Sequence, residues 1–192
     1  MNNKGRNVHS GGAGKPCGTA PGLESREAMK LLITGIPGTG KTQFGDYLAA
    51  AHDFVHRDLE LSEELAKFVK DPAEYLAALC LASDRVVISW GFIPAPEHIE
   101  LVRSFRNYGF EIIWFDGDRP AALRQFCKRG TSPEEHFYLQ MYRIENSKSR
   151  EQVDPIVINN FDGRGEFKEP LGLYEEIKRA LATQKPVANA TR

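Results

Sequence analysis

Residues 31–48 read LLITGIPGTGKTQFGDYL, an apolar run that breaks into glycines followed by a Lys-Thr pair. Gly35–Thr42 fits the pattern G-x-x-x-x-G-K-[ST], between a segment typical of a strand and one typical of a helix. Glycines permit backbone angles that turn several N–H groups towards one phosphate, and the helix that follows adds the positive end of its dipole. The segment therefore predicts a phosphate-binding loop.

The chemistry of this loop assigns a task to two of its side chains. Lys41 brings a mobile cation to the β- and γ-phosphates of a nucleotide, and the Thr42 hydroxyl is a ligand for Mg²⁺, which keeps several waters and needs few protein ligands. A glycine-rich turn that merely links a strand to a helix is the alternative, but it explains neither the Lys-Thr pair nor the spacing. The predicted nucleotide contacts are Gly35, Ile36, Pro37, Gly38, Thr39, Gly40, Lys41, Thr42 and Gln43.

Composition argues against several other classes of protein. The chain has 192 residues, of which 41% are hydrophobic and 27% charged, and this is enough for one domain with a sizeable core. Its formal net charge of −1 gives no general attraction to nucleic acid or to an anionic membrane. The three cysteines show no CxxC spacing, which argues against a zinc site. No apolar segment reaches the roughly 18 residues of a membrane span or resembles a signal peptide, so we expect a cytoplasmic protein.

The two ends of the chain differ in composition from the rest. Residues 1–27 are rich in Gly, Asn, Ser and Pro and almost lack large apolar side chains, which predicts a disordered tail. The tail contains GGAGKP at Gly11–Pro16, but no strand precedes it and Pro16 stands where a hydroxyl is needed, so we do not expect it to bind phosphate. We predict one nucleotide-binding domain over residues 28–184 and a frayed end over residues 185–192.

Between these ends, short apolar runs alternate with helical patterns, which is typical of parallel βαβ units and an α/β fold. We predict helices that begin near Lys41, Leu61, Pro72, Pro94, Arg119, Pro133 and Leu171. We predict strands over Lys30–Thr34, Phe54–His56, Arg85–Trp90, Glu111–Phe115 and Pro155–Ile158. In a parallel α/β sheet, ligands bind outside the carboxyl ends of the strands, so the residues that follow each strand are candidates for chemistry.

ITGIPGTGKT, together with the later stretch FVHRDLE, resembles the small P-loop kinases, a group that includes adenylate, shikimate and gluconate kinases. The resemblance extends over about Lys30–Leu181, and the phosphate loop is its most specific part. It implies the P-loop NTPase fold, which has three α/β/α layers around a mainly parallel five-stranded sheet. It also implies ATP with Mg²⁺ as phosphate donor, a small-molecule acceptor, and an arginine-bearing lid over the reacting phosphates.

Asp58 follows the second predicted strand, where members of this group often place an acid near the metal or the acceptor hydroxyl. A carboxylate there can hold a water bound to Mg²⁺ or orient the attacking oxygen, since phosphoryl transfer depends mainly on positioning and charge neutralisation. On this interpretation Asp58 is a catalytic residue and, with Thr42, a metal ligand. Alternatively, Asp58 caps a helix over Leu59–Val69, with Glu60 and Glu63 favouring its N-terminus.

The third predicted strand departs from the usual P-loop pattern. P-loop proteins usually end this strand with an acid, whereas Ser89, Trp90, Gly91 and Phe92 stand here. The metal then depends more on the two ligands named above, or catalysis is weak, although Ser89 can still hydrogen-bond a metal-bound water. Trp90 and Phe92 form either an apolar wall for an acceptor or part of the core.

Cations gather near the end of the helix that follows the fourth predicted strand. Arg124, Lys128 and Arg129 stand where the resembled kinases carry lid arginines, and a guanidinium fork matches phosphate geometry. We predict a catalytic role for Arg124 and Arg129, with residues 130–136 as a short lid and Arg143 as a further candidate. The alternative is that cations near a helix C-terminus only complement its dipole.

After the fifth predicted strand, the stretch IVINNFDGRG places Asn159 and Asn160 where similar kinases wrap a loop around the adenine. Backbone and amide groups can read the base edge there, and we predict that Asn160 contacts the nucleotide. The alternative is a plain turn, because Asn-Asn and Asp-Gly are common in turns.

Together these residues predict an ATP-dependent kinase of a small-molecule acceptor. One alternative is a regulatory nucleotide-binding protein that senses ATP with little turnover, which the missing acid at Ser89 favours. Another is a kinase of a polynucleotide or a protein, but the near-neutral net charge and the lack of a long basic stripe argue against nucleic acid. The sequence identifies neither the acceptor nor the oligomeric state.

Overall fold

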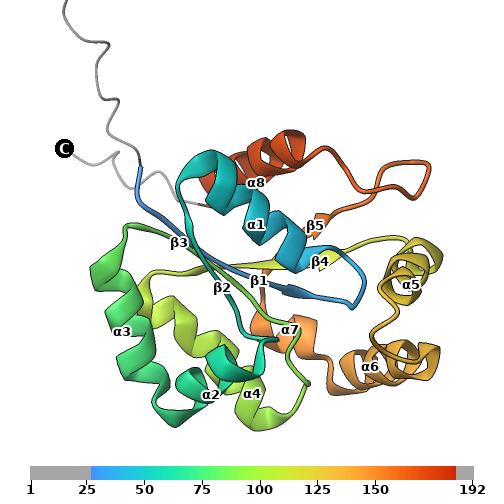
Figure 1. Cartoon of the computed structure of the whole chain (residues 1–192), viewed down its shortest axis with the longest axis horizontal. Coiled ribbons are helices and arrows are strands. Elements are labelled where there is room, and N and C mark those ends of the chain that lie inside the picture. Colours follow the sequence, from blue (N-terminus) through green and yellow to red (C-terminus); the bar gives the residue numbers. More distant parts are fainter. Residues whose placement is uncertain (1–26, 185–192) are drawn as a thin grey trace, which may run out of the picture.

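Five strands form one sheet at the centre of the molecule (Figure 1). The computed structural model describes residues 27–184; the predicted tail apart from Glu27, the GGAGKP segment and the predicted frayed end lie outside the described residues. The strands are β1 (Met29–Gly35), β2 (Val55–Asp58), β3 (Arg85–Ser89), β4 (Glu111–Asp116) and β5 (Ile156–Asn159). Their order is β2-β3-β1-β4-β5 and every pair is parallel, which confirms the predicted α/β sheet.

Helices cover both faces of this sheet and give the molecule three layers. They are α1 (Lys41–His52), α2 (Ser62–Lys70), α3 (Pro72–Ala82), α4 (Pro96–Ser104), α5 (Arg119–Lys128), α6 (Glu134–Ser147), α7 (Ser149–Val153) and α8 (Pro170–Gln184). In Figure 1, α1 and α8 lie on one face, α2, α3, α4 and α7 lie on the other, and α5 and α6 stand at one end. The three-layer arrangement is the predicted one.

The apolar runs of the strands are continuous because both sheet faces are covered. Successive side chains of a strand point to opposite faces. Leu31 and Ile33 of β1 therefore pack under α1 and α8, whereas Leu32 between them joins the core under α2, α3 and α4. All three side chains are fully buried. Helices thus cover both faces of β1, the central strand, and the phosphate loop begins at its carboxyl end.

The predicted elements match the observed ones closely, with two exceptions. The weakly patterned second strand runs over Val55–Asp58 rather than Phe54–His56, so Asp58 is the last residue of the strand itself. The structure also contains α7 and a 3₁₀ helix over Phe105–Tyr108, which the sequence analysis did not predict. Within residues 27–184, no helix is both long enough and apolar enough to cross a membrane.

Trp90 and Phe92 belong to the core. Both rings are buried, and Trp90 packs edge-on against Phe68 with ring centroids 5.4 Å apart. Phe92 makes a similar contact with Trp114 at 6.5 Å. The structure therefore supports the core alternative for these two aromatic residues.

Candidate active site

The phosphate loop has the backbone geometry that the glycine pattern predicts. Gly35, Gly38 and Gly40 have φ angles of 125°, 76° and 74°, which side chains rarely tolerate. Gly38 is also required by packing, since a Cβ there would collide with the carbonyl oxygen of Ala122 in α5. The Thr39 hydroxyl donates a hydrogen bond of 2.8 Å back to the Ile36 carbonyl and closes the loop. The loop is therefore held in its conformation by its own contacts, and α1 follows it from Lys41.

Lys41 lies under the loop with its ammonium group inward. Its Nζ donates a 3.1 Å hydrogen bond to the Ile36 carbonyl, and the residue is buried. Burial lowers the pKa of Lys41 below its usual value; the Glu60 carboxylate counteracts this shift, and the Arg129 guanidinium adds to it. A poorly hydrated ammonium group at this point can bind phosphate oxygens without a large further loss of hydration.

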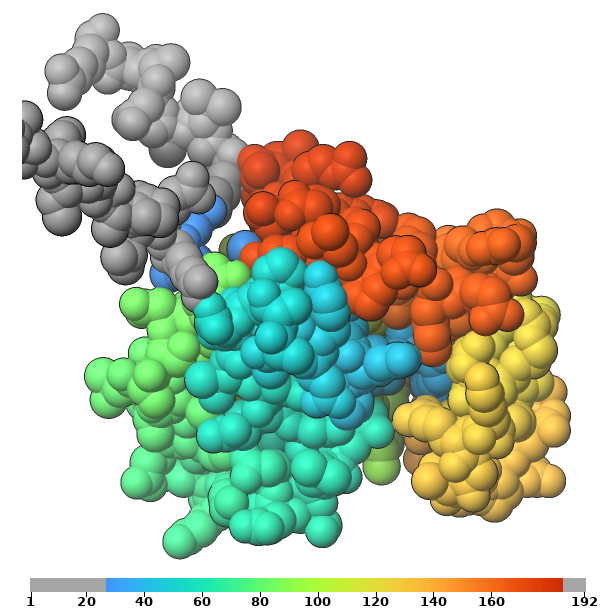
Figure 2. All heavy atoms as spheres, turned by 45° about the horizontal axis from the view of Figure 1, so that its top comes forward, coloured from blue at the N-terminus to red at the C-terminus, as the bar shows by residue number. Residues whose placement is uncertain are grey.

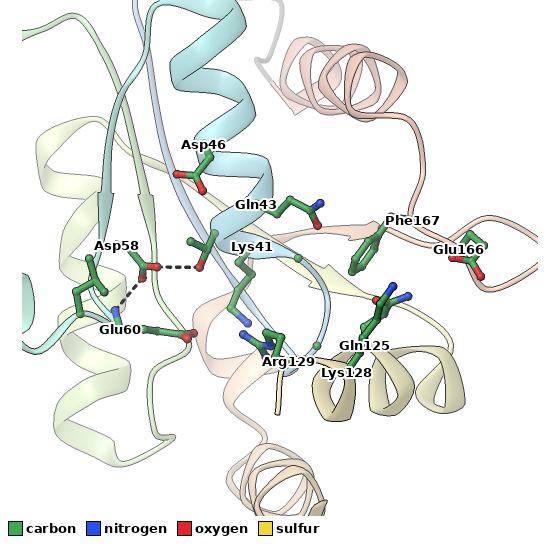
Figure 3. A pocket seen from close by; sticks show the side chains of 14 residues that line it. Lys41, Gln43, Asp46, Asp58, Glu60, Gln125, Lys128, Arg129, Glu166 and Phe167 are labelled. Atoms are coloured by element: carbon green, nitrogen blue, oxygen red, sulfur yellow. Dashed lines mark hydrogen bonds between the residues drawn. The ribbon is translucent and has the colours of Figure 1, made fainter. Parts of the chain in front are cut away.

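Asp58 and Thr42 are hydrogen-bonded to each other. The Thr42 hydroxyl donates to Asp58 Oδ2 at 2.8 Å, and the Glu60 backbone N–H donates to Oδ1 at 2.9 Å (Figure 3). The alternative that Asp58 caps the next helix is wrong, because α2 begins only at Ser62 and Asp58 closes the turn before it. The β2 strand and the first turn of α1 thus hold one carboxylate and one hydroxyl together.

This pair fits Mg²⁺ by its chemistry. A hydroxyl and a carboxylate are hard oxygen donors, and Mg²⁺ is usually bound by one or two such ligands together with water and substrate phosphates. Across residues 27–184 there is no cluster of three or more His, Cys, Asp or Glu side chains that could hold a metal by itself. Two oxygen ligands are enough for Mg²⁺ when water and phosphate oxygens supply the remaining ones.

A cavity of about 820 Å³ opens beside the loop (Figure 3). In the space-filling view a hollow separates the cyan surface of α1 from the yellow surface of α5 (Figure 2). Side chains of both charges line it together with the loop glycines. The lining residues are Gly38, Gly40, Lys41, Thr42, Gln43, Asp46, Asp58, Glu60, Leu61, Gln125, Lys128, Arg129, Glu166 and Phe167.

Glu60 is a site residue that the sequence analysis interpreted only as a helix-terminal acid. Its side chain points into the cavity beside Lys41 (Figure 3). Gly91, after the end of β3, makes room for it, since a Cβ there would collide with Glu60 Oε1 and would lie 3.5 Å from Lys41 Cε. The signal in the sequence was its position two residues after Asp58 in the stretch FVHRDLE.

The three candidate arginines have different surroundings. Arg129 lines the cavity and, in Figure 3, approaches Lys41 from α5. Arg124 lies on α5 with its guanidinium against Gly165, in the loop before α8, and Arg143 is exposed on α6. Neither of these two lines the cavity. The structure thus brings Arg129 to the site, and the phosphate role of Arg124 stays a prediction.

The loop after β5 touches the phosphate loop through two residues. Asn160 is buried, and its Nδ2 donates a 2.6 Å hydrogen bond to the Thr39 carbonyl, which ties β5 to the phosphate loop. Phe167 stacks on Phe161 with ring centroids 5.2 Å apart and stands next to Gly40 at the edge of the cavity. No sequence pattern around Phe167 predicted that it lines the site. The contact of Asn160 with the base of a nucleotide stays a prediction.

No family model and no curated protein matches the sequence. A gluconokinase from Sinorhizobium meliloti 1021 is similar in structure, with 21% identity, a TM-score of 0.51, and coverage of 83% of this chain and 99% of that one. A shikimate kinase from Acinetobacter baumannii in complex with shikimate has 14% identity, a TM-score of 0.56, and coverage of 84% and 98%. The chain has the fold of the small P-loop kinases. At these identities the likeness supports the fold and leaves the substrate open.

Proposed function

We propose that the protein transfers the γ-phosphate of ATP to a hydroxyl group of a small-molecule acceptor. The observation that carries the proposal is the convergence of Lys41, Asp58 and Arg129 on one cavity beside a preformed phosphate loop. Phosphoryl transfer needs positioned cations and an oriented nucleophile more than covalent chemistry. Similarity in fold to kinases supports a phosphotransferase in general.

The cavity suggests how the nucleotide is oriented. The triphosphate follows the N–H groups of the loop towards α1, with Lys41 at the β- and γ-phosphates. Phe167 stands at the far edge of the cavity, where its ring offers the adenine a stacking surface. When bound, Mg²⁺ would neutralise charge on the phosphates, and Thr42 and Asp58 are the residues that would hold it.

The opposite end of the cavity suits the acceptor. Glu60 and Leu61 line it there, and a carboxylate in this position can accept the proton of an attacking hydroxyl. Arg129 faces the same space from the end of α5 and can neutralise the transferring phosphate, whereas Lys128 lies beside Gln125 on the side of Phe167. This arrangement favours an acceptor small enough to share the cavity with ATP.

ADP production tests the proposal. We expect purified protein with ATP and Mg²⁺ to release ADP in the presence of one class among nucleosides, nucleotides and sugar acids, and the Lys41→Ala variant to lose this release. If ATP binds but no acceptor stimulates release of ADP, transfer to these small molecules is excluded.

A regulatory ATP sensor is the second candidate. The observation in its favour is Ser89 at the end of β3, where P-loop proteins usually carry an acid that helps to hold Mg²⁺. The same assay separates the two candidates, because a sensor binds ATP with Mg²⁺ and releases ADP slowly whatever acceptor is present.

A further inference from the structure

The acceptor end of the cavity, where Glu60 and Leu61 lie, combines a carboxylate with an apolar side chain. Glu60 points into the cavity beside Lys41 (Figure 3), and Gly91 leaves room for it. Leu61 is large and apolar, yet it is 59% exposed and lines the same cavity just before α2 begins. This end therefore offers a ligand one strong hydrogen-bond acceptor and one apolar contact.

The cations nearest to this end serve the transferring phosphate in the proposed function. Lys41 is buried under the phosphate loop, and Arg129 approaches it from α5 (Figure 3). Among the described residues, the remaining cation of the cavity lining is Lys128, which lies beside Gln125 on the side of Phe167. An acceptor with a carboxylate or phosphate of its own would compete with the transferring phosphate for Lys41 and Arg129.

Two basic side chains on the elements that flank this end are paired with a protein carboxylate. Lys67 Nζ donates a 2.9 Å hydrogen bond to Glu64 Oε1. Glu64 Oε2 accepts a 2.7 Å hydrogen bond from the Tyr75 hydroxyl and lies 3.8 Å from Arg57 Nε. The hydrogen bonds from Lys67 and Tyr75 lower the pKa of Glu64, so this carboxylate is ionised at neutral pH. Arg57 and Lys67 are thus engaged by Glu64, and neither lines the cavity.

Charge at the acceptor end opposes a charged acceptor. ATP with Mg²⁺ is itself an anion, and Asp58 and Glu60 add two carboxylates beside it. Like charges placed side by side weaken binding strongly, and specific sites exclude wrong partners in this way. An ammonium group would instead pair with Glu60 and displace the hydroxyl that this carboxylate orients in the proposed function. An uncharged acceptor meets neither obstacle.

We propose that the acceptor is an uncharged hydroxyl compound with an apolar face: its hydroxyl donates to Glu60 and its apolar face packs on Leu61. The inference rests on the proposed function, because it names the acceptor class of the same cavity. Glu60 opposes anions, and Leu61 favours a compound with a ring over a plain sugar. Among the acceptors of the ADP assay, nucleosides have this chemistry, whereas nucleotides and sugar acids carry an anionic group.

Matched compounds that differ in one charged group test the acceptor class. ADP release is measured at fixed ATP and Mg²⁺ with uridine and its 5′-monophosphate, UMP, and with glucose, gluconate and glucosamine. We expect uridine to be the best acceptor, with kcat/KM about 100-fold lower for UMP because of the like charges at the acceptor end. Gluconate and glucosamine should each have a lower kcat/KM than glucose.

Variants of two exposed leucines connect the preference to the acceptor end. Leu61→Arg brings a guanidinium to this end and should reduce the preference for uridine over UMP about tenfold. Leu81→Arg is the matched control and should leave this preference unchanged, because Leu81 is 89% exposed on α3 and does not line the cavity. Glu60→Gln should lower kcat for both compounds and also reduce the preference, since it removes one like charge. Circular dichroism confirms that each variant is folded.

The results separate the inference from the proposed function. Three results overturn the inference and leave the proposed function standing: a kcat/KM for UMP that equals or exceeds that for uridine, a preference for gluconate or glucosamine over glucose, or an equal effect of Leu61→Arg and Leu81→Arg on the preference for uridine. ATP binding without ADP release stimulated by any of these compounds contradicts the proposed function, and the inference falls with it.

Discussion

The ammonium group of Lys41 is buried by the loop that it serves. Because burial lowers its pKa, the folded state binds fewer protons than the unfolded state between the lowered pKa and the ordinary value of 10.5. Lys41 therefore destabilises the folded protein at neutral pH, and this penalty disappears as the pH rises through that window. We predict that the unfolding free energy of the wild type increases relative to that of Lys41→Met as the pH is raised from 7 towards 10.

Urea unfolding of both proteins at several pH values measures this difference. Lys67→Met is the control, because Lys67 is an exposed lysine on α2 that pairs with Glu63 and Glu64. The pairing raises the pKa of Lys67, so this lysine has the opposite effect on folding stability. Its ion pairs stabilise the folded protein below the ordinary pKa of 10.5, and this stabilisation is lost at higher pH. If the unfolding free energies of the two variants, relative to the wild type, change with pH in the same way, the burial argument for Lys41 is contradicted.

The substitution of Glu60 tests most directly how the acceptor is activated. Its carboxylate faces the cavity, whereas Glu63 lies on the exposed side of α2 and pairs with Lys67. We expect Glu60→Gln to lower kcat by on the order of 100-fold through loss of a proton acceptor, with little change in ATP affinity. Glu63→Gln is the matched control and should behave as the wild type. Steady-state kinetics with the acceptor from the ADP assay decides; a normal kcat in Glu60→Gln removes Glu60 from the mechanism.

At the scale of the elements, α1 approaches β2 closely because Gly45 has no side chain. A Cβ at Gly45 would collide with the His56 ring. Alanine favours a helix over glycine by about 1 kcal/mol, but the displaced ring costs about 1–3 kcal/mol, so we expect Gly45→Ala to destabilise the protein. Thermal unfolding measures the change, with exposed Ala50→Gly as the control for helix propensity.

The sign of this effect should reverse when the obstructing ring is removed. In a His56→Ala background, Gly45→Ala no longer meets the ring and should stabilise the protein by up to about 1 kcal/mol. If Gly45→Ala destabilises both backgrounds equally, the contact between Gly45 and His56 does not limit how closely α1 approaches the sheet.

The end of α5 carries the cationic side of the site. Arg129 lines the cavity and Arg124 does not, so Arg129→Ala should lower kcat by about 1,000-fold, the lower range for an arginine that stabilises the transferring phosphate. We expect smaller effects from Arg124→Ala and Arg143→Ala, measured in the same assay. If Arg124→Ala costs more than Arg129→Ala, the lid arginine is Arg124 and α5 must move when substrates bind.

Elements were predictable where their signal is local. The phosphate loop, the strands and most helix starts follow from spacing within a few residues. Asp118, for example, is the N-cap of α5, and its side chain accepts a hydrogen bond from the Ala121 backbone N–H. The contacts that complete the site join residues far apart in the chain. Ser89 meets His56 across 33 positions and Asn160 meets Thr39 across 121, and both contacts depend on sheet order and register. One sequence does not contain that information in a readable form.

Ligand binding changes the stability of the whole molecule. Any ligand of the folded state raises the unfolding free energy by mass action, by about 2.7 kcal/mol at 100 times its Kd. For a domain of this size we expect ATP with Mg²⁺ to raise the Tm by about 5 to 10 °C, and Lys41→Ala to lose most of this shift. An oligonucleotide at low salt should give no shift, because the net charge is −1. A shift with the oligonucleotide that disappears at high salt would instead favour a polynucleotide acceptor, and the cavity at Glu60 would then have to admit a strand end.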